Sequence, residues 1–200
     1  PPEDHDPNGN QRMRSAGKPL PGVEIKIVDG EGKEVPTGEV GELVTRSSNN
    51  MLGYWNLPDA TQKTLTNDGW VYTGDAAYVD ADGYVYIHDR VKDMIISGGE
   101  NVYPAEVESS IYGHPAVLEV AVIGVPDDRW GEAVKAVCVP KPGTQIDADD
   151  VIAWAREKIA GFKVPKSIDI IEALPRNASG KILRKDLRAP YWAGRDRQVN

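Results

Sequence analysis

The feature that most constrains the fold is a change of hydrophobic pattern near residue 90. Before it, apolar and polar residues alternate in GVEIKIVD (22–29), GEVGELVTR (38–46) and GWVYTGDAAYVDADGYVYIHDR (69–90). Alternation with a period of two is typical of strands with one buried face, and DADG inside the last run is a hairpin signal. Residues 20–88 therefore predict a mostly β module, with a short helix over 57–65.

After residue 90, helical patterns appear between strands. A proline at a first helical position predicts a helix that begins at Pro104 and ends at Gly113. LEVAVIGVPD (118–127), EAVKAVCVP (132–140) and SIDIIEAL (167–174) predict strands, and DADDVIAWAREKIAG (147–161) predicts an amphipathic helix closed by Gly161. The expected fold class is α+β: a β-rich region followed by a compact α+β domain.

Composition limits the kinds of partner. The chain of 200 residues is 40% hydrophobic and 27% charged, with a formal net charge of −8. An acidic chain is a poor ligand for nucleic acid or an anionic membrane surface, because phosphate attracts basic proteins. The sequence holds no apolar run of about 18 residues, so no membrane span is expected, and it shows no secretory signal. The single cysteine, Cys138, fits a small core residue in a reducing, cytoplasmic compartment.

Two residues of the first half are candidates for nucleotide binding. In YTGD (72–75), Gly74 allows a sharp turn that brings Asp75 toward a ligand, and a carboxylate can accept both hydroxyls of a ribose. Arg90, at the end of a strand pattern, can donate to a ribose hydroxyl or a phosphate. Taken alone, Gly-Asp is equally typical of an ordinary turn.

Candidates in the second half surround the pattern boundary and a polar loop. Lys92 lies at the boundary, where a hinge is expected, because hinges are element-terminal residues. Gly98 and Gly99 allow a narrow ligand to pass along bare backbone, or simply turn the chain into the next helix. In PRNASGKIL, polar residues and glycine predict a mobile loop that carries Lys181. That lysine suits an oxygen whose negative charge grows in a transition state, with an ordinary solvated lysine as the alternative.

The histidines are scattered along the chain and none has metal-ligand spacing, so no metal site is predicted within this sequence.

The order of these motifs resembles the C-terminal part of the acyl- and aryl-CoA synthetases, members of the adenylate-forming enzyme superfamily. YTGD is followed by GYVYIHDRVKDMIISGGENVYPAEVE, VIGVPDDRWGEAVKAVCV and PRNASGKILR, and the resemblance covers roughly residues 15 to 190. Members of this family convert a carboxylate and ATP to an acyl-adenylate and pyrophosphate. A thiol, usually that of CoA, then displaces AMP. The small C-terminal domain rotates between the two steps.

The resemblance implies roles for the candidate residues. Tyr72 and Asp75 would bind the nucleotide, the carboxylate through the ribose hydroxyls, and Arg90 would assist at the ribose and phosphates. Lys181 would bridge the acyl carboxylate and the α-phosphate during adenylation. Lys92 would be the hinge. The residues that would line the pantetheine tunnel in the thioester-forming state are Ser97, Gly98 and Gly99.

The resemblance also implies domain bounds. Residues 1–89 would be the distal, β-rich part of the large AMP-binding domain, 90–92 the hinge, 93–188 the mobile C-terminal domain and 189–200 a tail. The family's Ser/Thr/Gly-rich phosphate loop and its magnesium-binding glutamate are absent from this sequence. We therefore expect ATP, CoA and Mg²⁺ to serve a longer parent enzyme, with the Mg²⁺ ligand outside this chain, and expect these residues alone to be inactive.

Three interpretations of function differ in the acceptor and in catalysis. DMIISGGENVYPAEVE favours a fatty acid–CoA ligase of the medium- or long-chain type, acting on a small carboxylic acid. The alternatives are an adenylating enzyme that loads a carrier protein, and a non-catalytic module that binds a nucleotide, CoA or a partner. A β module cut from a larger domain leaves strand edges that can pair with a second copy, so the sequence allows a homodimer without requiring one.

Overall fold

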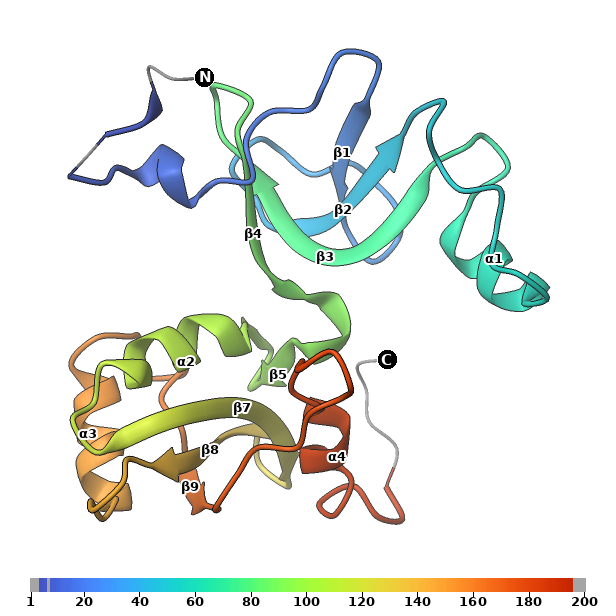
Figure 1. Ribbon diagram of the computed structural model, residues 1–200. Helices are drawn as coiled ribbons and strands as arrows, with labels where there is room; N and C mark the ends of the chain where they lie inside the picture. The colour runs from blue at the N-terminus through green and yellow to red at the C-terminus, as the bar shows by residue number, and fades with distance from the viewer. Residues whose placement is uncertain (1–3, 7, 196–200) are drawn as a thin grey trace. The chain divides into compact units, whose positions relative to one another are not determined.

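The computed structural model describes residues 4–6 and 8–195, and the chain divides into two compact units, Pro1–Val91 and Lys92–Asn200. Figure 1 shows that each unit has its own sheet. The boundary falls within the expected hinge, 90–92, whose role as a hinge remains a prediction. Residues 196–200 of the expected tail lie outside the described residues.

The first unit is an antiparallel meander, as the alternating runs predict. Its strands, in sheet order, are β1 (Glu24–Val28), β2 (Gly41–Arg46), β3 (Val71–Val79) and β4 (Val85–Arg90). The 3-10 helix η2 (Gln11–Arg14) precedes β1, and the short helix α1 (Pro58–Thr64) lies in the connection between β2 and β3. Two small hydrophobic clusters stabilise the sheet, one around Ala77 and Val85 and the other around Val44 and Trp70.

The second unit follows a 3-10 turn, η3 (Val91–Asp93), and mixes strands with helices. Its elements are β5 (Ile95–Ser97), β6 (Glu100–Val102), α2 (Pro104–Tyr112), β7 (Val117–Asp127), β8 (Gly131–Pro140), α3 (Ala148–Arg156), β9 (Ser167–Ile170) and α4 (Arg184–Arg188). The sheet order is β6-β5-β8-β7, and β9 pairs in parallel with β8. The expected α+β class is confirmed.

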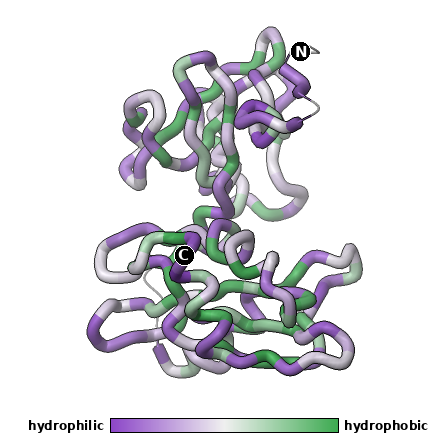
Figure 2. The backbone as a smooth tube through the Cα atoms, turned by 90° about the vertical axis from the view of Figure 1, so that its left-hand side faces the viewer, coloured by the Kyte–Doolittle hydropathy of each residue, from purple (hydrophilic) through white to green (hydrophobic). Residues whose placement is uncertain are grey.

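Strands β7 and β8 are apolar along almost their whole length because both faces of their sheet are covered. On one face α2 and α3 pack Val107, Ile111, Val151 and Ala155 against the sheet. On the other face the chain's later segment packs, with Leu174 buried and Leu187 of α4 and Tyr191 half-buried. Figure 2 shows hydrophobic residues gathered along these central strands.

Two boundaries and two short elements differ from the sequence predictions. Helix α3 begins at Ala148, one residue after the predicted start, but ends at Arg156 rather than at Gly161. The N–H of Glu157 donates to the carbonyls of Ala153 and Ala155, which tightens and ends the last turn. Strand β9 ends at Ile170 rather than at Leu174, and strand β6 and helix α4 were not predicted, because elements of three to five residues are too short to show a period.

No helix in the part of the chain that the structure describes is both long and apolar enough to cross a membrane.

Candidate functional site

Asp75 and Arg90 are cross-strand partners on β3 and β4. The Nε atom of Arg90 lies 3.0 Å from Oδ1 of Asp75, and its Nη1 donates to the carbonyl of Thr73 at 3.2 Å. The carboxylate side chain is 29% exposed and the guanidinium side chain 51% exposed. Sheet pairing therefore presents an anion and a cation together, both within reach of a ligand.

The YTGD segment is bent, and side chains hold the bend. Gly74 has φ +74°, in the region that favours glycine, and its N–H donates to Oε1 of Glu42 at 3.0 Å. The hydroxyl of Thr73 donates to the carbonyl of Leu43 at 2.7 Å and accepts from the N–H of Asp75 at 3.1 Å. A register shift in β2 lies opposite this segment. The predicted sharp turn at Gly74 is thus present as a distortion within a strand.

Glu42 is a site neighbour that sequence reasoning missed. Burial raises the pKa of its carboxyl, the N–H of Gly74 lowers it, and the charge of Asp75 raises it further. A glutamate in an alternating run is normally the solvent-facing residue, so the sequence held no signal for this contact.

Tyr72 lies half-buried against the cluster of Val28, Val44 and Trp70. The ring therefore contributes to the core of its unit, and its role in nucleotide binding remains a prediction.

Lys181 is exposed at the end of a closed turn. The side-chain oxygen of Asn177 accepts from the N–H of Ser179 at 3.0 Å, from its hydroxyl at 2.8 Å and from the N–H of Lys181 at 2.9 Å. The N–H of Asn177 donates to the carbonyl of Lys181 at 2.9 Å. The sequence predicted a mobile loop here, but the structure has a turn with its own network of hydrogen bonds.

The turn is also attached to β7. Arg176 donates from Nη1 to the carbonyl of Gly180 at 2.7 Å, while its Nη2 lies 2.5 Å from Oε1 of Glu119. This side chain joins the backbone beside Lys181 to a strand of the central sheet.

Helix α4, which follows the turn, is held by a cluster of ion pairs. Arg184 contacts Glu108 of α2 at 2.7 Å and Asp93 at 3.8 Å, and Arg188 contacts Asp93 at 2.9 Å. Asp93 is buried and directly follows Lys92, the predicted hinge. The second unit therefore connects its first residues to the element that follows the lysine turn.

The other candidates of this unit lie at its first strands. Lys92 is exposed in η3. Ser97 is buried at the end of β5, and Gly98 and Gly99, with φ of +63° and +86°, form the turn into β6. A Cβ on Gly98 would lie 2.7 Å from the ring of Trp130. Hairpin geometry and this ring thus require glycine at 98, and its place in a pantetheine tunnel remains a prediction.

Within the described residues, no group of three or more His, Cys, Asp or Glu side chains fits a metal ion.

Two family models match the chain, one described as AMP-binding enzyme over residues 4–55 and one as AMP-binding enzyme C-terminal domain over residues 106–181. The fatty acid–acyl-carrier-protein ligase ScoC of Streptomyces coeruleorubidus is 50% identical over 200 residues, which are 100% of this chain and 38% of that protein. A feruloyl-CoA synthase of Amycolatopsis sp is 52% identical over 181 residues, 90% of this chain and 37% of that protein. The chain thus spans less than two-fifths of these relatives.

Solved structures give the same result. ATP-bound MatB from Rhodopseudomonas palustris superposes with a TM-score of 0.82 at 41% identity, over 89% of this chain and 36% of that one. The o-succinylbenzoate CoA synthetase MenE of Bacillus subtilis, in complex with its acyl-adenylate intermediate, has a TM-score of 0.81 at 42% identity, over 88% and 35%. The resemblance noted from the motifs is confirmed. The chain belongs to the AMP-binding, adenylate-forming enzyme superfamily, and it corresponds to the C-terminal portion of the superfamily's acyl-CoA ligases.

Proposed function

We propose that the chain supplies the C-terminal part of an ATP-dependent acid–thiol ligase. In the first step a carboxylate oxygen attacks the α-phosphorus of ATP, the bond to the bridging oxygen breaks, and pyrophosphate leaves. In the second step a thiolate attacks the acyl carbon, the bond to the phosphate oxygen breaks, and AMP leaves. The observation that carries the proposal is the exposed Lys181 on its braced turn, in a unit matched by the family's C-terminal domain.

Electrostatics gives Lys181 its role in the first step. That step brings two anions together, and a cation placed between them lowers the barrier. A fixed backbone at residue 181 leaves only the lysine side chain to be ordered when the anions arrive.

Asp75 and Arg90 supply nucleotide contacts in this proposal. The carboxylate accepts from the ribose hydroxyls, while the guanidinium donates to the ribose and phosphates. Their half-exposed ion pair supports the assignment, since it holds an anion and a cation 3.0 Å apart where a ligand can reach both. Lys92 acts as the hinge and residues 97–99 line the thiol path. A Mg²⁺ ion would neutralise phosphate charge, and we place its ligand outside this sequence.

The substrate is a carboxylic acid with a hydrophobic body, and we favour a fatty acid. Two of the relatives are named for a fatty acid and for ferulate, which share that character. CoA is the acceptor that we propose first. A carrier-protein thiol is the second candidate, because the relative that matches the whole chain at 50% identity is a fatty acid–acyl-carrier-protein ligase.

A chimera tests the proposal, with this chain replacing the matching part of the Amycolatopsis feruloyl-CoA synthase. Lys181→Ala should slow ferulate-dependent pyrophosphate release about 10²–10³-fold, the cost of removing one transition-state donor. Formation of feruloyl-CoA from supplied feruloyl-adenylate should stay within a few-fold of the unsubstituted chimera.

Lys185→Ala is the matched control, because Lys185 is an equally exposed lysine on α4, and it should leave both rates unchanged. The chain alone should release no pyrophosphate. A folded chimera without activity, or equal loss of both half-reactions in Lys181→Ala, would contradict the proposal.

A further inference from the structure

Among the described residues, the turn that carries Lys181 has two counterparts with the same type of bracing side chain and the same hydrogen bonds. Residues 29–33, 80–84 and 177–181 share the pattern Asp or Asn, two variable residues, glycine and a fifth residue. In each turn one side-chain oxygen of the first residue accepts from the N–H groups of the third and fifth residues. The acceptors, with these two distances, are Asp29 (2.9 and 2.9 Å), Asp80 (3.0 and 2.9 Å) and Asn177 (3.0 and 2.9 Å).

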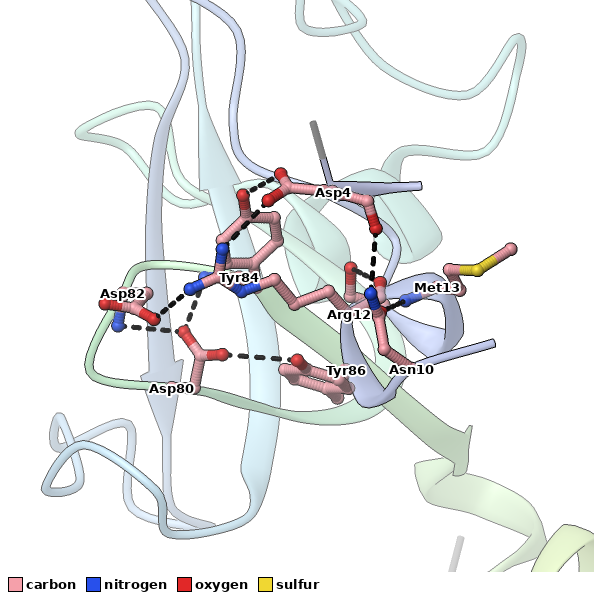
Figure 3. Close-up of polar contacts among 9 residues, drawn as sticks. Asp4, Asn10, Arg12, Met13, Asp80, Asp82, Tyr84 and Tyr86 are labelled. Atoms are coloured by element: carbon pink, nitrogen blue, oxygen red, sulfur yellow. Dashed lines mark hydrogen bonds and ion pairs between the residues drawn. The ribbon is translucent and has the colours of Figure 1, made fainter. Parts of the chain in front are cut away.

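The backbones of the three turns are also alike. The N–H of the first residue donates to the carbonyl of the fifth at 2.9, 3.0 and 2.9 Å, and the glycine N–H donates back to the first carbonyl at 3.0, 3.0 and 2.9 Å. The glycines have φ of +80°, +83° and +82°. Figure 3 shows the Asp80 turn, with the carboxylate of Asp80 directed at the backbone of its own turn. Each turn therefore fixes the backbone of its fifth residue: Lys33, Tyr84 or Lys181.

The turns differ in the charge of the bracing residue. The first two use aspartate, whose charge makes it the stronger acceptor for N–H groups. Accordingly, the N–H of Tyr84 leads the contacts that hold the pKa of Asp80 below its usual range. The turn that presents Lys181 uses the neutral amide of Asn177 in the same geometry. A neutral acceptor also occurs in the turn 66–70, where the hydroxyl oxygen of Thr66 accepts from the N–H of Trp70 at 2.9 Å, so the turn geometry itself accommodates either charge.

We propose that Asn177 is a positioning residue for adenylation, and that it braces the backbone of Lys181 with an acceptor that must stay neutral. This inference rests on the proposed function and deepens it. A carboxylate at 177 would lie within one lysine side-chain length of the Lys181 ammonium, because the side-chain oxygen at 177 accepts from the backbone N–H of Lys181. It would draw that ammonium back and repel the anions that Lys181 serves.

The decisive variant is Asn177→Asp, because the turns at Asp29 and Asp80 demonstrate that aspartate fits this backbone. In the chimera we expect pyrophosphate release to fall about tenfold or more at low salt, and the deficit to shrink as salt screens the added charge. The rate of thioester formation from supplied adenylate should change less than about threefold, which is smaller than the roughly tenfold change expected where the added charge acts. Hydrogen exchange of the amides of Ser179 and Lys181 in the 200-residue chain should stay as slow as in the unsubstituted chain.

Two further variants separate bracing from charge. Asn177→Ala should speed exchange of both amides and also slow adenylation, about 10- to 100-fold, because the lysine backbone loses its brace. Asn177→Thr restores a weaker acceptor, so it should recover part of the slow amide exchange and part of the adenylation rate. Asp29→Asn makes the opposite charge change in the same turn geometry, and it should leave adenylation unchanged.

Adenylation at the unsubstituted rate in Asn177→Asp, in a chimera that Lys181→Ala inactivates, overturns this inference and leaves the proposed function standing. Fast amide exchange in Asn177→Asp overturns the requirement for neutrality, because the loss is then structural. Undiminished adenylation in Lys181→Ala would instead remove the proposed function itself.

Discussion

The two units hold their candidate residues by different means. In the first unit, Asp75 and Arg90 are opposite each other on a strand ladder, so backbone hydrogen bonds set their separation. In the second unit, Lys181 stands on a turn whose shape and attachment come from side chains, above all those of Asn177 and Arg176. A ladder tolerates the loss of one side chain better than a turn braced by one, so mutations beside the two sites should differ in effect.

Ion pairs show the same contrast. Glu24 and Arg46 pair at 2.7 Å across β1 and β2, with 59% and 39% of their side chains exposed. In the second unit, Arg184 lies between Glu108 and the buried Asp93 and joins elements far apart in sequence. The Glu24–Arg46 pair adds little to a sheet that backbone hydrogen bonds already hold together, whereas the contacts of Arg184 attach α4 to the rest of its unit.

The largest expected effect comes from Arg184→Met. Among the described residues, removal of this cation leaves the mostly buried Glu108 without its ion-pair partner and Asp93 with Arg188 alone, and the unit should lose about 3 kcal/mol of unfolding free energy. Hydrogen exchange of β7 amides as a function of urea measures this loss for the second unit alone.

Arg46→Met is the control in the first unit, with an expected loss below about 1 kcal/mol for an exposed pair. Equal losses in the two variants would contradict the comparison, because exposed and buried ion pairs would then contribute equally to the free energy of unfolding.

A second test compares two glycines of positive φ, Gly98 in the second unit and Gly74 in the first. An alanine at either position is strained by about 1–2 kcal/mol. At Gly98 the new methyl would also meet the ring of Trp130 at 2.7 Å, whereas at Gly74 the nearest atom, on Arg90, lies 3.8 Å away. Gly98→Ala should therefore cost about 1–3 kcal/mol more than Gly74→Ala in urea unfolding of the respective units. Equal costs would mean that the Trp130 ring moves aside freely.

Sequence reasoning located β1 to β4 and β7 to β9 because alternation and apolar runs are local signals. It also placed the start of α2 from Pro104 and the start of α3 within one residue, from the amphipathic pattern that begins at residue 147. The candidate residues came from the order of motifs, which resembles a family, rather than from any motif alone.

What the sequence could not predict depends on distant partners. Helix α4 has five residues, and its arginines contact Asp93 and Glu108, which lie far away along the chain. Gly98 is required partly by Trp130, on the loop before β8. The sequence predicted a mobile loop around Lys181, where the structure has a hydrogen-bonded turn. The sequence did contain a local signal for this turn, because Asn-x-x-Gly at 177 matches the Asp-x-x-Gly pattern of the turns at 29 and 80.

The smallest expected effect is the pH dependence that one carboxyl in each unit adds to the free energy of unfolding, and its sign differs between the two units. The raised pKa of Glu42 means that its contribution to the first unit is present below the unfolded value, 4.5, and is lost as pH rises through the folded value. In the second unit, burial alone would raise the pKa of Asp169, but hydrogen bonds from Lys135 and Tyr191 lower it below 3.8. That contribution is present above the unfolded value and is lost as pH falls.

The contributions of Glu42 and Asp169 to stability should therefore change in opposite directions over the acid range. Hydrogen exchange of β3 and β8 amides between pH 3 and 6, corrected for the intrinsic exchange rate, follows both units in one sample. Glu42→Gln should remove its contribution from the pH response of β3 only, and Asp169→Asn should do so for the pH response of β8 only. If either substitution altered the pH response of the other unit, the carboxyls would not act locally, and the separation of the two units on which the comparison rests would fail.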